Sequence, residues 1–134
     1  MMLMVVAAIV ERDGRMLIGQ RRPGGSHALK WEFPGGKVES GESPEVAITR
    51  ELREELAIEA SGVQEIHRYE YAYESKRPLL LVFMRVLTFS GEPVNQAFAK
   101  IAWARPSDFA RYDFLDGDRD FLIWLAASGS SRTT

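Results

Sequence analysis

The chain has 134 residues, a length typical of one domain, and its 46% hydrophobic content is enough for a substantial core. A net charge of −2 with scattered basic residues gives no sign of a polynucleotide groove or a membrane-binding surface. The absence of cysteine excludes disulfides and thiolate metal sites. The apolar stretch 1–10 is too short to span a bilayer and lacks the features of a signal peptide, so we expect a cytoplasmic protein.

The first part of the chain is predicted to form strands joined by loops. Residues 4–11 are rich in Val and Ile and indicate a buried strand, and Asp13-Gly14 is a hairpin turn signal. Residues 15–20 are the predicted second strand of this hairpin. The segment 21–30 contains Pro23-Gly24-Gly25 and is predicted to be a loop. A short strand is expected at residues 37–39.

A helix is predicted to follow over residues 44–58. Ser43 is a good N-cap, and proline is preferred at the first helical position, where Pro44 stands. Apolar residues then recur every fourth position and form one stripe along the helix: Ile48, Leu52 and Leu56. This stripe is the face that we expect to pack against the core.

The remaining elements alternate between strands and a second helix. Residues 63–74 alternate between aromatic and charged side chains, which indicates a half-buried strand. Residues 79–89 are almost wholly apolar and predict a central strand covered on both faces. A short strand is expected at 101–104 and an amphipathic helix at 119–127. The polar segment 128–134 is expected to be a disordered tail.

This order of elements predicts an α/β fold in which two helices cover opposite faces of a central mixed sheet. We expect residues 1–127 to form a single domain with this α/β/α sandwich architecture.

Three carboxylates lie on one flank of the first helix, beside the apolar stripe. Glu51 forms like-charge pairs with Glu54 and Glu55, each costing roughly 0.2–0.5 kcal/mol, and all three lie in the half of the helix that disfavours anions. A solvated charged face is the alternative interpretation. A divalent cation such as Mg²⁺ would turn the repulsion into coordination, because hard cations bind carboxylate oxygens.

A glycine-rich loop precedes this helix. Gly35, Gly36 and Gly41 permit backbone conformations closed to other residues and allow a ligand to approach the chain closely. Hairpins use the same residues, so the glycines alone are a weak signal. Their combination with Glu42 and the acidic helix at a fixed spacing makes the pattern specific.

The stretch 36–58 resembles the Nudix box, G-x5-E-x7-R-E-U-x-E-E-x-G-U, in which U is a bulky aliphatic residue. The matching residues are Gly36, Glu42, Arg50, Glu51, Leu52, Glu54, Glu55 and Ile58. Ala57 replaces a glycine that usually ends the helix, so we expect a slightly extended or differently capped helix end. The segment 31–34, WEFP, and the pair Arg21-Arg22 look like the MutT-type branch, the nucleoside triphosphate pyrophosphohydrolases.

The resemblance implies a Nudix-type fold and a magnesium-dependent hydrolysis of (deoxy)nucleoside triphosphates to the monophosphate and pyrophosphate. It implies that Glu51, Glu54 and Glu55 bind Mg²⁺, with Mn²⁺ as a substitute, and that the Gly35 carbonyl is a further ligand. Arg50, acting through Glu42, would orient the acidic cluster rather than touch substrate. Glu54 is the first choice for the general base and Glu51 the second.

One departure from MutT-like enzymes concerns the loop at residues 95–100. Relatives often supply a further metal-binding carboxylate from this region, whereas this loop contains no acid. The number of metals and the identity of the base therefore stay open.

Five residues are candidates for substrate binding, each with a structural alternative. Arg21 or Arg22 could reach phosphate or a purine oxygen, or be solvated. Trp31 and Phe33 could stack on a base, or belong to the core. Asp118 could read the base edge, or cap the last helix. Both 8-oxo-dGTP and CTP or dCTP therefore remain open as substrates.

The alternatives to this activity are hydrolysis of ADP-ribose or dinucleoside polyphosphates and a non-catalytic nucleotide-sensing module. We expect a nucleoside triphosphate as the partner, with neither polynucleotide nor membrane. We expect a monomer, with a dimer as the alternative.

Overall fold

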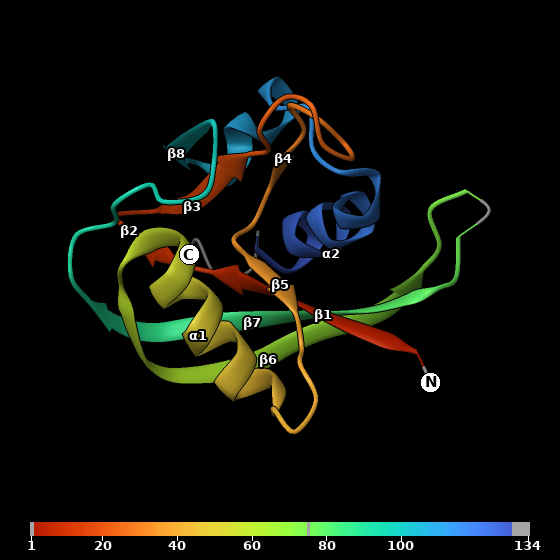
Figure 1. Ribbon diagram of the computed structural model, residues 1–134. Coiled ribbons are helices and arrows are strands. Elements are labelled where there is room, and N and C mark those ends of the chain that lie inside the picture. The colour runs from red at the N-terminus through yellow and green to blue at the C-terminus, as the bar shows by residue number, and fades with distance from the viewer. Residues whose placement is uncertain (1, 75, 130–134) are drawn as a thin grey trace.

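The protein is described here from a computed structural model, which defines residues 2–74 and 76–129 (Figure 1). The helices are α1 (Pro44–Leu56) and α2 (Arg119–Gly129), with two short 3-10 helices, η1 (Pro106–Arg111) and η2 (Asp116–Asp118). The strands are β1 (Leu3–Ile9), β2 (Glu11–Arg12), β3 (Arg15–Gln20), β4 (Trp31–Glu32), β5 (Gly35–Lys37), β6 (Glu59–Tyr71), β7 (Leu79–Ser90) and β8 (Lys100–Ala104).

The centre of the fold is a four-stranded mixed sheet in the order β5-β1-β7-β6. Strands β1 and β7 run parallel, whereas β5 and β6 pair antiparallel with their neighbours. Helix α1 covers one face of this sheet and α2 the other (Figure 1). The predicted α/β/α sandwich with a central mixed sheet is therefore confirmed.

Alternate residues of β7 divide the core into two layers. Val82 and Met84 point toward α1 and pack with Leu52 in the first layer. Phe83 points toward α2, where its ring stacks on that of Phe121 with 4.0 Å between the centroids. Strand β7 is thus covered on both faces, as its nearly continuous apolar sequence predicted.

A second, smaller sheet packs beside the first and carries part of the site. Strand β3 pairs with β8 along its length and with the short strands β2 and β4. Asp13 and Gly14 have φ values of 55° and 76°, which is the backbone of the hairpin turn that the sequence predicted between β2 and β3. Strand β4 ends three residues before β5 begins, so one short segment links the two sheets.

Helix α1 begins as predicted, whereas its end differs in detail. The Ser43 hydroxyl accepts a hydrogen bond from the Val46 N–H at 3.1 Å, and Pro44 occupies the first turn. The helix ends at Leu56 and is not extended. Ala57 takes the left-handed conformation, with φ 56° and ψ 33°, and its N–H donates to the Arg53 carbonyl. Alanine therefore occupies a backbone position that favours glycine.

Other boundaries differ from the predictions by a few residues. The strand before α1 lies at 35–37 rather than 37–39, because it is residues 35–37 that pair with β1. Strand β6 begins at Glu59, and a bulge interrupts its register between Glu65 and His67. Helix α2 runs to Gly129, so two residues of the expected tail 128–134 are helical, and the rest of that segment lies outside the described residues.

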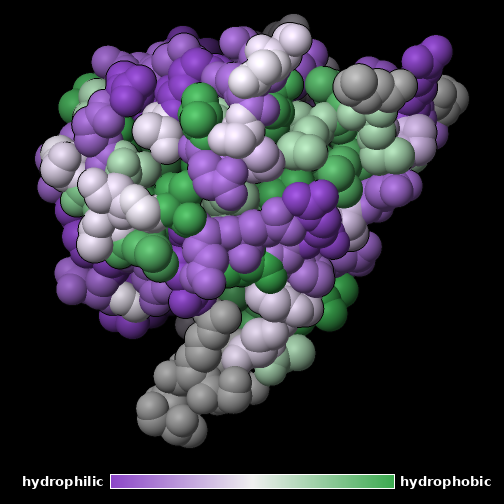
Figure 2. All heavy atoms as spheres, turned by 90° about the horizontal axis from the view of Figure 1, so that it is seen from below, coloured by the Kyte–Doolittle hydropathy of each residue, from purple (hydrophilic) through white to green (hydrophobic). Residues whose placement is uncertain are grey.

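On the face shown in Figure 2, hydrophobic residues form several patches that are separated by hydrophilic residues. Val46 of α1, Leu87 of β7 and Ile123 of α2 are each more than half exposed, at 55%, 57% and 69%. Within residues 2–74 and 76–129, neither α-helix combines the length and the apolar character that a bilayer crossing would need.

Candidate functional site

The pairing of β5 with β1 places the glycine-rich segment against the C-terminal half of α1. A Cβ atom at Gly36 would overlap the Oε2 atom of Glu51, so only glycine leaves the Glu51 carboxylate where it lies. The N–H of Gly35 donates a 3.0 Å hydrogen bond to Oε1 of Glu55. The glycines therefore let two carboxylates of the helix lie directly on the backbone of the loop.

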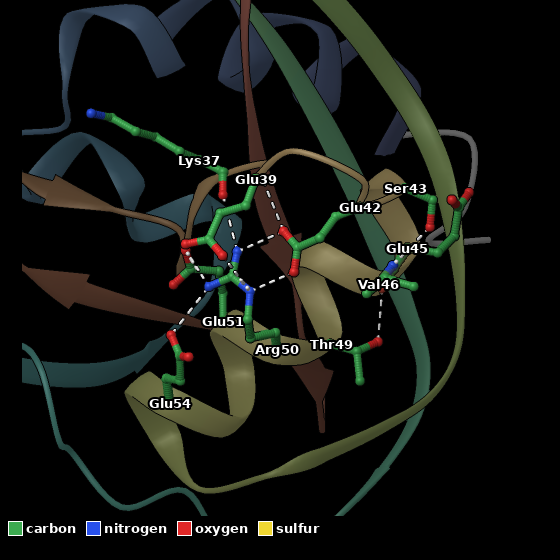
Figure 3. A network of polar contacts seen from close by, with 10 residues as sticks. All are labelled: Lys37, Glu39, Glu42, Ser43, Glu45, Val46, Thr49, Arg50, Glu51 and Glu54. Carbon is green, nitrogen blue, oxygen red and sulfur yellow. Dashed lines mark hydrogen bonds and ion pairs between the residues drawn. The ribbon is translucent and has the colours of Figure 1, made fainter.

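Arg50 is the centre of the polar network on this helix (Figure 3). Its Nε and Nη2 atoms donate to the two carboxylate oxygens of Glu42 at 2.6 and 2.9 Å, a bidentate pair. Its Nη1 atom lies 3.4 Å from Glu51 and 3.2 Å from Glu54. Nη2 also donates to the Lys37 carbonyl at 3.1 Å, which ties the helix to the end of β5. One guanidinium thus fixes the loop and two of the three carboxylates.

Charge and burial divide the carboxylates of this network into two kinds. The Arg50 guanidinium lowers the pKa of Glu42 to about 2. Burial raises the pKa of Glu51, with Arg50 opposing this shift. Burial and then the charge of Glu51 raise the pKa of Glu55 to about 8, with the Gly35 N–H opposing them. Glu42 is therefore a structural anion, whereas Glu51 and Glu55 are carboxylates crowded at one place.

The donor set fits a hard divalent cation in its chemistry. Three carboxylates come from one helix, and Glu51 and Glu55 repel each other. A bound cation would neutralise their negative charges. Among the described residues, no three acidic or histidine side chains already enclose a metal-sized point. Their oxygens are held by protein partners instead, because Arg50 contacts Glu51 and Glu54 while the Gly35 N–H contacts Glu55.

A cleft of about 440 Å³ lies next to this cluster. The segments around it are far apart in sequence: the loop after β3, β4, β5, the segment after β6, and η2. Its lining includes Arg21, Glu32, Gly35, Glu55, Tyr73 and Asp118. The same cleft is therefore lined by Glu55, one of the two crowded carboxylates, and by a buried acid of η2, Asp118.

Glu32 is a member of this site that the sequence reasoning missed. Its carboxylate accepts two 3.2 Å hydrogen bonds from Nη1 of Arg21. Burial raises the pKa of Glu32, and Arg21 opposes this shift. The sequence did contain a signal, a single acid between Trp31 and Phe33. Side chains alternate along a strand, so this acid points away from the face that carries the two aromatic rings.

The two candidate arginines occupy different places. Arg21 lines the cleft and holds Glu32, and its Nε also donates to the Ser26 carbonyl at 3.1 Å. Arg22 does not line this cleft. Its Nε donates to the Ala97 carbonyl at 2.9 Å, so it fastens the loop 21–30 to the segment before β8.

The two candidate aromatic residues belong mainly to the core. Phe33 is only 2% exposed and packs against the rings of Phe109, Phe114 and Phe121, although one side of it lines the cleft. Trp31 is not part of the lining. It packs edge-on against Tyr112, with 4.9 Å between the centroids, because alternation along β4 directs it to the α2 side.

Asp118 lies at the entry to α2, as the sequence predicted, and its side chain is buried in the wall of the cleft. Burial, and then the charge of Glu32, raise the pKa of Asp118 to about 8. If Asp118 capped the helix, its carboxylate would accept a hydrogen bond from the N–H of Phe121. That N–H instead donates to the Tyr69 hydroxyl at 3.1 Å. The geometry thus favours the cleft-facing interpretation over the cap.

The loop 95–100, which carries no acid, packs against the end of α1. The N–H groups of Val94 and Gln96 donate to the carbonyls of Leu56 and Glu55 at 2.8 and 2.9 Å. These bonds satisfy helix carbonyls that would otherwise lack partners. Phe98 is buried and lies so close to Gly19 that a Cβ atom there would overlap its ring.

Comparisons with known proteins show which chains this protein is similar to. The family model described as the NUDIX domain matches residues 2–125. The chain is 38% identical to a CTP pyrophosphohydrolase of Escherichia coli over 98% of this chain and 96% of the relative. It is 35% identical to an 8-oxo-dGTP diphosphatase of Haemophilus influenzae over 75% and 74% of the two chains. A structure from a study of MutT from Aliivibrio salmonicida and Vibrio cholerae superimposes with a TM-score of 0.80 at 31% identity, covering 96% of this chain and 99% of the other.

Proposed function

Because the chain belongs to the Nudix family and is a MutT-like hydrolase within it, we propose that it hydrolyses nucleoside triphosphates to the monophosphate and pyrophosphate with Mg²⁺. The observation that carries this proposal is the meeting of the glycine loop with Glu51 and Glu55 of the helix, beside a cleft that Glu55 lines. The substrate class is that of nucleotide-pool sanitising enzymes, with 8-oxo-dGTP and CTP or dCTP as the candidates.

Nudix enzymes generally use a divalent metal, and the carboxylates of α1 are the residues that would hold it here, with the Gly35 carbonyl as a further ligand. When bound, Mg²⁺ supplies neutralisation of charge on the phosphoryl oxygens and a lower pKa for a coordinated water. Arg50 and Glu42 contribute by fixing the positions of Glu51 and Glu54 through the contacts described above. Mn²⁺ is expected to substitute.

The general base is proposed to be Glu54, with Glu51 as the second choice. The Glu54 side chain is 58% exposed and therefore reaches solvent from which a water could enter, whereas that of Glu51 is 14% exposed and lies on Gly36. Both are restrained by the same guanidinium, so either carboxylate would take a proton from a fixed position.

The base of the substrate is proposed to occupy the part of the cleft where Asp118 and one side of Phe33 form the wall. Arg21 also lines this cleft and orients Glu32. A buried acid that pairs with a polar group of the base would discriminate strongly, because an unpaired buried group is costly.

A substrate panel with Mg²⁺ tests the activity. Release of pyrophosphate from 8-oxo-dGTP, dGTP, CTP or dCTP is the expected result, with the monophosphate as the second product. Release of inorganic phosphate instead, or turnover of ADP-ribose or a dinucleoside polyphosphate in preference to all four, would assign another reaction. Nucleotide binding without any product would assign a sensing module.

Single substitutions test the residue roles. Glu54→Gln and Glu51→Gln should each lower turnover at least about a hundredfold, the low end for loss of a general base or a metal-binding charge. Glu45→Gln is the matched control, because Glu45 is exposed on the first turn of the same helix and should be nearly silent. Similar losses in all three variants would disprove the assignment.

A further inference from the structure

Two tyrosine hydroxyls from β6 and the segment after it hold the turn that carries Asp118. The Tyr69 hydroxyl donates to the Gly117 carbonyl at 2.6 Å and accepts from the Phe121 N–H at 3.1 Å. The Tyr73 hydroxyl accepts from the Gly117 N–H at 3.0 Å. Both peptide groups of Gly117 and the first turn of α2 are therefore bonded to side chains more than forty positions earlier in the chain.

The packing around this turn is as tight as the hydrogen bonding. A Cβ atom at Gly117 would overlap the Tyr73 hydroxyl, so glycine lets the two chains meet. The Tyr73 ring also contacts that of Tyr71, with 4.8 Å between the centroids, and that of His27 in the loop over the cleft, at 4.6 Å. Tyr73 thus joins three of the segments that line the cleft.

Both hydroxyls are suited to fixed hydrogen bonds. Burial raises the pKa of Tyr69 and raises that of Tyr73 to about 12, so both hydroxyls are protonated at neutral pH. The turn that they hold places the Asp118 carboxyl in the cleft wall, beside the backbone of Phe33. No charged side chain is needed to restrain this acid.

We propose that Tyr69 and Tyr73 are positioning residues for base selection, which act by holding the Gly117 turn so that the Asp118 carboxyl faces the bound base. This proposal rests on the proposed function and adds the residues that set the geometry of its specificity end. Tyr73 lines the cleft and is in reach of a bound substrate, whereas Tyr69 is absent from the lining. Tyr69 therefore isolates the effect that passes through the turn.

The hydrogen bonds can be tested without any substrate. Tyr69→Phe should accelerate amide hydrogen exchange at Phe121, and Tyr73→Phe should accelerate it at Gly117, each by at least about fivefold, the equivalent of one ordinary hydrogen bond. Tyr71→Phe is the matched control, because its hydroxyl makes no hydrogen bond within the described residues, and it should change neither rate. Unchanged exchange at both amides would show that the two tyrosine hydroxyls do not hold the Gly117 turn.

The functional part is tested by kinetics on CTP, dCTP, 8-oxo-dGTP and dGTP. Tyr69→Phe and Tyr73→Phe should each raise KM for the preferred nucleotide about fivefold or more and leave kcat nearly unchanged. The differences in kcat/KM among the four nucleotides should become smaller. In an Asp118→Ala background, the same changes should have almost no further effect, because all three residues act through one contact.

The outcomes separate the inference from the activity on which it rests. Failure of the wild-type protein to turn over any of the four nucleotides would reject the proposed function. The exchange rates would still decide whether the two tyrosine hydroxyls hold the Gly117 turn. Accelerated exchange with an unaltered KM and base ranking would reject the positioning role. Equal kinetic losses with and without Asp118 would reject it as well.

Discussion

At the scale of single residues, Gly36 shows how closely the loop and the acidic helix meet. Gly36→Ala should lower kcat, because the added Cβ must displace the Glu51 carboxylate, which is the flexible end of its side chain and can move at little cost in folding. We expect a melting temperature close to that of the wild type. Gly25→Ala is the control, since a Cβ there meets no atom within 4 Å. Loss of stability with intact turnover would show that Glu51 is merely packing.

Asp118 gives a pH-dependent prediction at the same scale. Its carboxyl is neutral in both states only well below pH 3.8, where the unfolded chain ionises. In the folded protein, burial and then the charge of Glu32 raise its pKa to about 8. The stability that the wild type has at low pH is therefore lost progressively between these values. Asp118→Asn, which cannot ionise, should gain stability relative to the wild type as pH rises from 4 to 8. Denaturant titrations of both proteins at several pH values measure the difference in their free energies of unfolding. If Asp118 were solvated, this difference would not change with pH.

At the scale of elements, the end of α1 is the point where the chain departs from its own motif. Ala57 occupies a left-handed conformation that costs a non-glycine residue roughly 1–2 kcal/mol, and its side chain is exposed. Ala57→Gly should therefore raise the free energy of unfolding by about 1 kcal/mol after the entropy of glycine is included.

The matched control is the same substitution in a right-handed position. Ala126→Gly, at an exposed site in α2, should lower the free energy of unfolding by about 0.5–1 kcal/mol. Urea denaturation measures the change in the free energy of unfolding for both variants. Changes of opposite sign would show that Ala57 is strained and Ala126 is not. Two losses of similar size would mean that Ala57 is not strained in solution.

At the scale of the whole molecule, the acidic cluster makes stability depend on the ion. Mg²⁺ that binds only the folded state should raise the melting temperature by mass action. Glu55→Gln should raise the melting temperature without Mg²⁺, because it removes a carboxyl whose ionisation is disfavoured in the folded state by burial and by the charge of Glu51. It should also reduce the gain on adding Mg²⁺. Thermal melts with Mg²⁺ and with EDTA test this, with Glu45→Gln expected to keep the full gain. Identical melts in the two conditions would leave the cluster as a charged surface.

The parts that could be predicted from sequence were those fixed by local periodicity and caps. The stripe of Ile48, Leu52 and Leu56, the Ser43 cap and the apolar run of β7 each specify one environment, and the structure confirms them. The glycine loop and the acidic helix were identified by their resemblance to the Nudix box.

What the sequence did not yield depends on contacts between distant segments. The place of Glu32 in the cleft depends on its pairing with Arg21, and the core position of Phe33 depends on η1, η2 and α2 closing around it. The hydroxyl bonds of Tyr69 to the Gly117 turn have no counterpart in any local pattern. Ala57 shows the other limit, since the chain kept the conformation of the missing glycine instead of changing the helix.

The parallel pairing of β1 with β7 also has a consequence for how the chain reaches this fold. Leu3 pairs with Leu79 and Ile9 with Arg85, so β1 meets its main neighbour across more than half of the sequence. During synthesis, β1 leaves the ribosome long before β7, with only the short strand β5 to pair with in the meantime. Pairings between such distant segments slow folding, because the intervening chain must be closed first. The glycine loop can therefore contact β1 early, whereas the cleft beside it can form only once nearly the whole described chain has been made.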